Sequence, residues 1–220
     1  MAQKLMLLAL AVVSAAALAL PAGAPATEIH LTNVTKFSGT FNGGTLAAKE
    51  EPTIECGELS HAEGTVSAGG TTGTISLDYT GCRAIGFFFC QTAGAPLNNT
   101  IRTSGSFHFI KIRNSTLDTV PAVLITPEHT SITCAGFEKP NTITGNVIGT
   151  ITSPECGGSS KKMSISFNSN SGPTQEHKTN TTGISYNLTS QTGTGGTIKE
   201  AGLTAVATVE STFPGTLDCT

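Results

Sequence analysis

The chain has 220 residues and a formal net charge of -3, with 12 Lys or Arg against 15 Asp or Glu. Charged residues make up only 12% of the chain, and no basic run is longer than Lys161-Lys162. This balance argues against a nucleic-acid partner, against an anionic membrane surface and against disorder caused by excess charge.

The N-terminus has the three parts of a secretory signal peptide. Lys4 is followed by an apolar run from Leu5 to Leu20 and then by Ala24-Pro25-Ala26, whose small residues suit signal peptidase. The run is short for a membrane span, which needs about 20 residues. We therefore expect a signal peptide over 1–26, cleaved after Ala26. Residues 27–220 are then expected to be a single domain without an integral membrane segment, secreted or held at the cell envelope.

Composition and periodicity indicate an all-β domain. Roughly one residue in six is threonine, which favours strands over helices. Segments in which apolar and polar residues alternate one by one recur every ten to fifteen residues, a spacing typical of a sandwich or barrel. The clearest predicted strands lie in 27–34, 72–81, 106–113 and 162–169. Two further segments, 119–130 and 141–156, are more continuously apolar, which suits either a strand buried on both faces or a strand that crosses between sheets.

Near the end of the chain, 181–190 and 201–212 flank the glycine-rich sequence 191–196, a pattern that predicts a hairpin. We expect it to form a C-terminal β-ribbon over about 182–219. The predicted fold is a two-layer antiparallel β-sandwich of about ten to twelve strands with disulfides. A closed β-barrel is the alternative.

The chain has six cysteines, and an even number in an exported protein favours disulfides over free thiols. No C-x-x-C occurs, and the spacing of Cys82 and Cys90 does not fit a zinc site. Because only a short loop separates Cys82 from Cys90, we expect these two to pair. For the other four cysteines three pairings are open, of which Cys134 with Cys156 and Cys56 with Cys219 is preferred.

Three consecutive phenylalanines, Phe87, Phe88 and Phe89, lie inside the Cys82–Cys90 loop. In an extended segment neighbouring side chains alternate faces, so at least one phenylalanine must point away from the core. Either other parts of the domain cover both faces, which is the preferred interpretation, or the three residues form an exposed contact patch.

The sequence predicts no catalytic, cofactor-binding or metal-binding residues. The five histidines show no H-E-x-x-H or H-x-H spacing, and no G-x-S-x-G nucleophile motif occurs. A glycoside hydrolase would require two carboxylates to converge in a groove. The candidates for such a pair are Glu55, Glu58, Asp78, Asp118 and Glu138.

Several short segments resemble a group of exported, β-rich bacterial proteins that have no assigned activity. In that group a strand ends in TGC, a short loop leads to a second cysteine, and a G-x-V-I-G-x-I segment follows. The similarity spans roughly Phe37 to Thr152. Its segments are FSGTFNGG, TIECG, LDYTGCRAIGFFFCQTAGAP, TIRTSG, VPAVLITP, SITCAGF and ITGNVIGTIT. The resemblance implies an extracytoplasmic β protein and transfers no catalytic residues.

Together these features predict a secreted or envelope-associated bacterial protein of structural or interaction type, with no enzymatic activity. Its partner is not identified by the sequence, and a protein or a cell-surface glycan would fit. Two alternatives are a secreted hydrolase acting on polysaccharide or cell wall, and a module that binds a small apolar ligand. The last would use Phe87 to Phe89 to line a concave apolar pocket.

Overall fold

The computed structural model describes residues 29–57, 60–113, 119–170 and 172–219, so the expected signal peptide lies outside the described residues. The described part contains seventeen strands, and within it no helix is long and apolar enough to cross a membrane. The strands are β1 His30–Thr32, β2 Lys36–Ala48, β3 Ile54–Cys56, β4 Ser60–Val66, β5 Thr72–Tyr79, β6 Arg83–Ala84, β7 Phe88–Thr92, β8 Ile101–Arg113, β9 Thr119–Pro127, β10 Thr130–Cys134, β11 Asn141–Gly145, β12 Val147–Ser153, β13 Ser159–Phe167, β14 Ser169–Asn170, β15 Thr174–Gln175, β16 Leu188–Thr192 and β17 Ile198–Asp218.

The all-β, antiparallel prediction is confirmed, but the strands outnumber the ten to twelve expected. The excess comes from very short strands such as β6 and β14, which have two residues each and carry no periodicity that a sequence could reveal. The longer strands follow the predicted alternation. In β5, for example, Ile75, Leu77 and Tyr79 are buried while the residues between them are partly or fully exposed.

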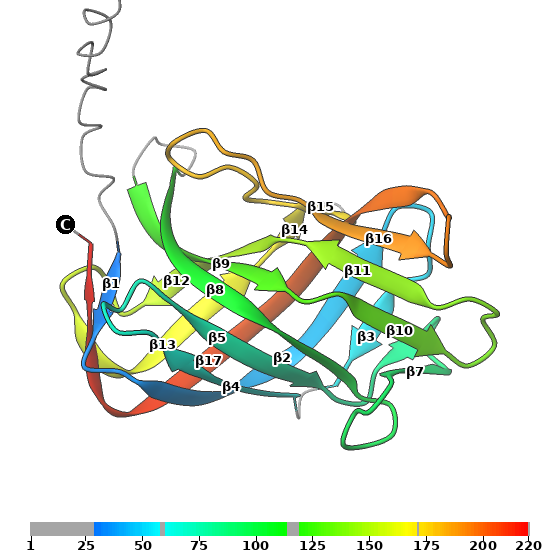
Figure 1. Ribbon diagram of the computed structural model, residues 1–220, viewed down its shortest axis with the longest axis horizontal. Helices are drawn as coiled ribbons and strands as arrows, with labels where there is room; N and C mark the ends of the chain where they lie inside the picture. The colour runs from blue at the N-terminus through cyan, green and yellow to red at the C-terminus, as the bar shows by residue number, and fades with distance from the viewer. Residues whose placement is uncertain (1–28, 58–59, 114–118, 171, 220) are drawn as a thin grey trace, which may run out of the picture.

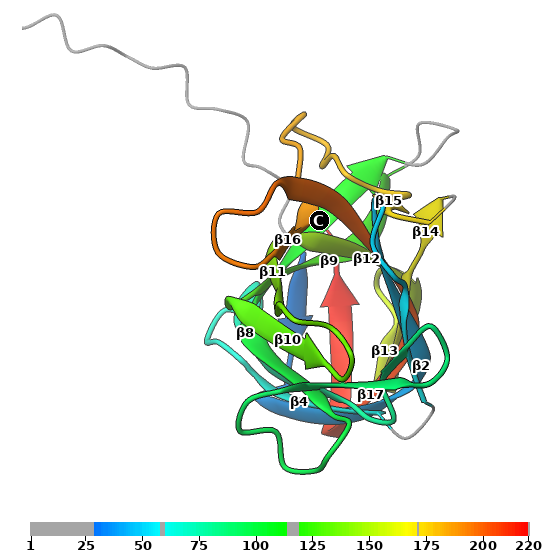
Figure 2. The same ribbon diagram turned by 90° about the vertical axis from the view of Figure 1, so that its right-hand side faces the viewer.

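Fifteen of the described strands belong to one continuous sheet that wraps around the core (Figures 1 and 2). The pairing runs from β17 through β13, β12, β9, β8, β5, β4 and β2 and returns to β17. A second path leads from β2 through β3, β6, β7, β10, β11 and β16 to β17. Because both paths share β2 and β17, the sheet is not a clean barrel.

Of the two continuously apolar segments, 119–130 contains a strand buried on both faces, whereas in 141–156 only Val147 to Gly149 are buried in succession. In β9 the four successive residues Ala122 to Ile125 are all buried. Val123 and Ile125 face the main core, while Ala122 and Leu124 join a separate cluster on the other face. The chain between β15 and β16 covers this second cluster. It arches over the upper ends of β8 and β9 (Figure 1), with Tyr186 packed on the cluster and a bridge between Asn180 and Ile112.

The C-terminal hairpin is formed by β16 and β17, which pair from Leu188 opposite Ala201 to Gln191 opposite Ile198. Strand β17 then continues for 21 residues and pairs with β2, β13 and β1 as well. It is therefore built into the wall of the sheet rather than forming a ribbon with β16 alone. This long strand fixes the register of the outer face described next.

Candidate functional site

Polar side chains form two parallel rows on the outer face of the sheet. The rows cross six neighbouring strands, β13, β17, β2, β4, β5 and β8, and residues within a row are direct cross-strand partners. The first, which we call the Glu63 row, is Lys162, Glu210, Ser38, Glu63, Ser76 and Ser104. The second, the His61 row, is Ser164, Thr208, Thr40, His61, Asp78 and Arg102.

These rows follow from simple alternation within each strand. In β4, Ser60, Ala62 and Val66 are buried, so His61 and Glu63 must point outward. Antiparallel pairing then sets outward residues of adjacent strands directly opposite one another, about 5 Å apart. The result is a continuous polar surface made of hydroxyl groups with charged groups placed among them.

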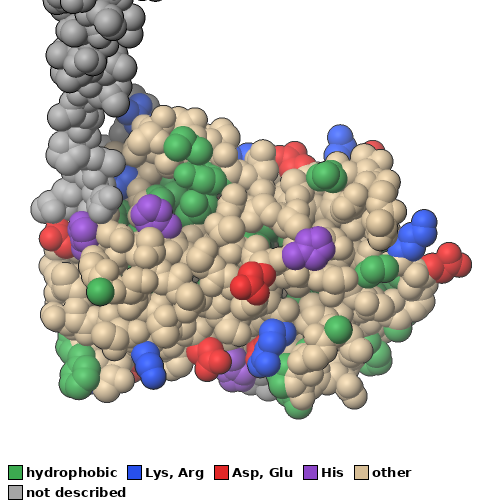
Figure 3. All heavy atoms as spheres, viewed as in Figure 1, with side chains coloured by type: hydrophobic (Ala, Val, Ile, Leu, Met, Phe, Trp, Pro, Cys, Tyr) green, Lys and Arg blue, Asp and Glu red, His purple; other side chains and the backbone are tan. Residues whose placement is uncertain are grey.

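The rows line a groove of about 640 Å³. Ser38, Thr40, His61, Glu63, Ser76, Asp78, Arg102, Lys162, Thr208 and Glu210 contribute to its walls, together with Gly39 and Ala62. Figure 3 shows basic, acidic and histidine side chains gathered along the lower margin of the molecule, over β4, β5 and β8. The volume of the groove is within the range of about 300–1,000 Å³ that is common for ligand sites.

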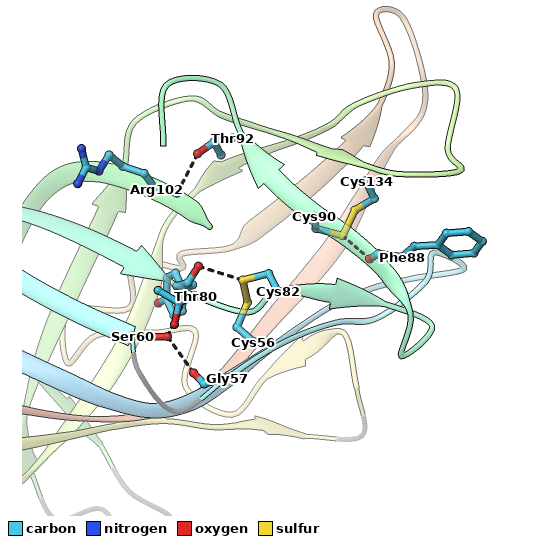
Figure 4. Close-up of a disulfide and its surroundings, with 11 residues drawn as sticks. Cys56, Gly57, Ser60, Thr80, Cys82, Phe88, Cys90, Thr92, Arg102 and Cys134 are labelled. Carbon is cyan, nitrogen blue, oxygen red and sulfur yellow. Dashed lines mark hydrogen bonds between the residues drawn. A yellow bond between two sulfur atoms is a disulfide. The ribbon is translucent and has the colours of Figure 1, made fainter. Parts of the chain in front are cut away.

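Most charges in this groove are already paired. Arg102 donates from Nε and Nη2 to the two carboxylate oxygens of Asp78, each at 2.6 Å, and these hydrogen bonds raise the pKa of the guanidinium. The Arg102 backbone N–H also donates to Thr92 Oγ1 at 2.8 Å (Figure 4). Lys162 Nζ lies 3.7 Å from Glu210 Oε2. Glu63 has no hydrogen-bonded or ion-paired partner among the described residues, so its carboxylate is available to a ligand.

The three described acids among the five proposed from the sequence do not converge. Asp78 lies in the groove, whereas Glu55 is on β3 opposite Arg83 and Glu138 lines a different hollow. Glu58 and Asp118 are outside the described residues. Sequence reasoning missed Glu63 and Glu210, although the alternation in SHAEGTV and in AVATVEST places both on the outer face.

The disulfide pairings expected from the sequence are wrong, although all six cysteines are bridged. The bonds join Cys56 to Cys82, Cys90 to Cys134 and Cys156 to Cys219. The chain end is therefore tied by Cys156 rather than by Cys56. Figure 4 shows Cys82 and Cys90 turned toward different partners.

The two cysteines of the short loop are each bonded to a cysteine on another strand. Cys90 N–H donates to Cys82 O at 2.9 Å, whereas Cys82 N–H donates to Asn99 O, also at 2.9 Å. Cys90 and Cys134 are cross-strand partners on β7 and β10 with a Cα–Cα distance of 4.0 Å. Cys82 reaches Cys56 at the end of β3, also with a Cα–Cα distance of 4.0 Å.

The phenylalanine run is exposed at the tip of this hairpin, contrary to the preferred expectation that the domain covers both of its faces. Phe87 is 62% exposed and Phe89 45%, while Phe88 is half-buried and packs edge-on against Phe137. Arg83 lies over the Phe89 ring, 4.9 Å from its centroid. The alternation argument is therefore confirmed, and the tip is an exposed apolar surface.

Two apolar cavities lie inside the sheet, with volumes of about 50 and 80 Å³. None of the three phenylalanines lines either cavity. Both are much smaller than the roughly 300 Å³ at which small-molecule pockets begin, so they do not favour the apolar-ligand alternative.

The described residues include no cluster of three or more His, Cys, Asp or Glu side chains that could hold a metal ion. The chain matches no family model, no curated protein and no solved structure. The groove, defined by the Glu63 and His61 rows, is therefore assigned as the candidate site on its geometry alone.

Proposed function

We propose that the protein is an exported bacterial binding protein that contacts its partner through the groove and catalyses no reaction. Two features support export: the signal-peptide pattern over 1–26 and the three disulfides, which are typical of an oxidising compartment. The observation that carries the proposal is the continuity of the Glu63 and His61 rows across six strands.

A binding role fits the state of the groove's charges better than hydrolysis does. Glycoside hydrolysis needs one carboxylic acid to donate a proton and a second carboxylate to act as base or nucleophile. Both oxygens of Asp78 already accept a hydrogen bond from Arg102, so about two of the roughly four acceptor positions of this carboxylate are occupied. Glu63 would then have to act with Glu210, which already faces Lys162.

The test measures binding of the mature protein to cell walls and extracellular polysaccharide isolated from the bacterium that produces it. Thr40→Arg places a long side chain in the groove at an exposed position of β2. Thr133→Arg makes the same change at an exposed position of β10, outside the groove, and serves as the matched control.

We expect Thr40→Arg to abolish binding and Thr133→Arg to leave it intact. Equal binding by both variants would overturn the assignment of the groove. Release of reducing sugar from the same material by the wild-type protein, lost in Glu63→Gln, would replace the binding role with the hydrolase alternative.

A further inference from the structure

We propose that the tip of the β6–β7 hairpin inserts into the interfacial layer of a zwitterionic phospholipid bilayer and so holds the protein at a membrane surface. The tip is defined as residues Ile85 to Phe89. The inference goes beyond the proposed function, because it assigns a second contact surface that shares no residue with the groove. Four properties of the tip support it: exposure, a fixed base, shape and charge.

The tip exposes large apolar side chains that the fold leaves uncovered. Ile85 is 56% exposed, Phe87 62% and Phe89 45%. With about 200 Å² for each fully exposed side chain, the three present roughly 300 Å² of apolar surface to water. Single exposed apolar residues are common, but a patch of a few hundred Å² is often a site of contact with a membrane or another molecule.

Two disulfides hold the hairpin in this exposed position. Cys82 precedes β6 and is bonded to Cys56, and Cys90 lies in β7 and is bonded to Cys134. Cys82 and Cys90 are fully buried, whereas the segment between them extends away from the two disulfides at its base (Figure 4). Because both ends of the segment are fixed, the phenylalanines are presented outward, and binding does not have to order a flexible loop.

The shape of the tip favours a bilayer over a folded partner. The chain reverses within two residues, Ile85 and Gly86, which both have positive φ, so the hairpin is narrow at its end. Phe88 and Phe89 are neighbours in β7 and therefore lie on opposite faces of the hairpin. The apolar surface surrounds a narrow protrusion. A fluid bilayer contacts such a protrusion on every side, whereas a flat protein surface contacts it on one side.

A second copy of the chain fits the tip less well. A specific interface buries about 800 Å² on each partner, well above the area that the tip exposes. The neighbouring aromatic residue does little to enlarge this surface, because Phe137 is partly buried and packs edge-on against Phe88 with ring centroids 5.4 Å apart. Insertion into a bilayer has no such minimum area, since its strength scales with the apolar area that leaves water.

The charges around the tip match a zwitterionic surface. The tip has no charged residue, so its insertion carries no charge into the apolar layer. The Arg83 guanidinium lies 4.9 Å from the centroid of the Phe89 ring, a position from which it can reach lipid phosphates. Arg83 has Glu55 as its cross-strand partner, and Glu138 and Lys139 lie between β10 and β11, so these four charges cancel. No attraction to anionic lipid is therefore required.

The test is flotation of the mature, oxidised protein with phosphatidylcholine vesicles, at physiological and at high salt. Binding is expected at both, because burial of apolar surface is not screened by salt. Phe87→Ser is expected to weaken binding about tenfold. Phe213→Ser is the matched control and should bind like the wild type. Phe213 is 68% exposed and lies in β17 close to the residues that pair with β1, and β1 and β7 lie at opposite ends of the molecule (Figure 1).

A second measurement reports insertion directly. The chain has no tryptophan, so Phe87→Trp places a single fluorophore at the tip. Its emission should shift to shorter wavelength with vesicles and should be quenched by lipids brominated in their acyl chains, whereas Phe213→Trp should show neither effect.

Three outcomes would overturn the inference: no binding to the vesicles, equal binding by Phe87→Ser and the wild type, or Phe87→Trp emission that vesicles do not change. Binding that requires anionic lipid or is lost at high salt would replace insertion with charge attraction. Thr40→Arg, which alters the groove, should bind vesicles normally. Loss of vesicle binding in this variant would assign the membrane contact to the groove instead of the tip.

Discussion

Replacing Cys90 and Cys134 together by alanine should destabilise the fold strongly, and the size of the effect can be calculated from the connectivity. The bond closes a loop with a sequence separation of 44 residues. In the chain-entropy description, opening a loop of this length restores about 13 cal/mol/K to the unfolded chain, or about 4 kcal/mol at 25 °C. For a chain of this size, each kcal/mol lowers Tm by about 2–4 °C, so Tm should fall by about 8–16 °C.

Alanine is the appropriate replacement because both sulfurs are buried. Cys90 is fully buried and Cys134 nearly so, and both pack in the main core. A serine hydroxyl would add the cost of burying an unpaired polar group. The measurement is urea denaturation followed by circular dichroism, with thiols counted by a labelling reagent in the unfolded state.

The control is the pair expected from the sequence, Cys82→Ala with Cys90→Ala. This variant removes one half of each of two disulfides and should release two free thiols, on Cys56 and Cys134. The Cys90/Cys134 variant should release none. The reverse thiol counts would show the connectivity to be incorrect, and a loss of less than about 1 kcal/mol in the Cys90/Cys134 variant would refute the entropy argument.

Three further substitutions or titrations probe local features. Ile85 is exposed in the turn from Ala84 to Phe87 and has φ of 52°, a conformation that is strained for a β-branched residue and better tolerated by Asn. Ile85→Asn should therefore raise the free energy of unfolding by about 1 kcal/mol in urea denaturation. A decrease would contradict this argument. Thr100 is fully buried, and its Oγ1 has no hydrogen-bond partner among the described residues. Thr100→Val should therefore raise the free energy of unfolding by about 1 kcal/mol. A decrease would indicate that the hydroxyl makes a hydrogen bond in the folded protein. Burial raises the pKa of Tyr79, so its phenol stays protonated in the folded state at a pH where the unfolded tyrosine ionises. The free energy of unfolding should therefore fall as the pH rises above about 10. Ionisation of both tyrosines near their ordinary pKa, followed by absorbance at 295 nm and without unfolding, would contradict this.

Much of the fold could be predicted because the alternation of apolar and polar residues along a strand indicates which face of the strand is buried. The pattern in 72–81 identified Ile75, Leu77 and Tyr79 as core residues, and the loss of alternation in 119–130 identified a strand covered on both sides. The very short strands carried no such signal. They exist because neighbouring chain segments offer backbone hydrogen bonds, which depends on tertiary structure.

The disulfides and the candidate site could not be predicted for a common reason: both depend on register. Cys82 and Cys90 are close in sequence and joined by a backbone hydrogen bond, yet strand pairing sets Cys134 opposite Cys90, and Cys82 is bonded to Cys56. The sequence identified Asp78 only as one of five candidate acids, and strand pairing is what sets it between His61 and Arg102. The sequence specifies which residues face outward but not which of them are neighbours.

One irregularity in β2 explains how this strand can belong to both pairing paths. Opposite β17, Phe41 pairs with Ala207 and Gly44 with Ala205, so two residues of β2, Asn42 and Gly43, face the single residue Val206. Gly43 has φ of 73°, a conformation that glycine adopts without strain. A bulge of this kind reverses which alternate positions face inward. Before the bulge, Ser38 and Thr40 therefore face the groove, and after it Gly44 and Leu46 line an internal cavity beside β3. Without the extra residue, the polar side chains of β2 would face the core along one half of the strand. The bulge therefore allows β2 to line the groove with one half and to pair with the disulfide-bonded β3 with the other.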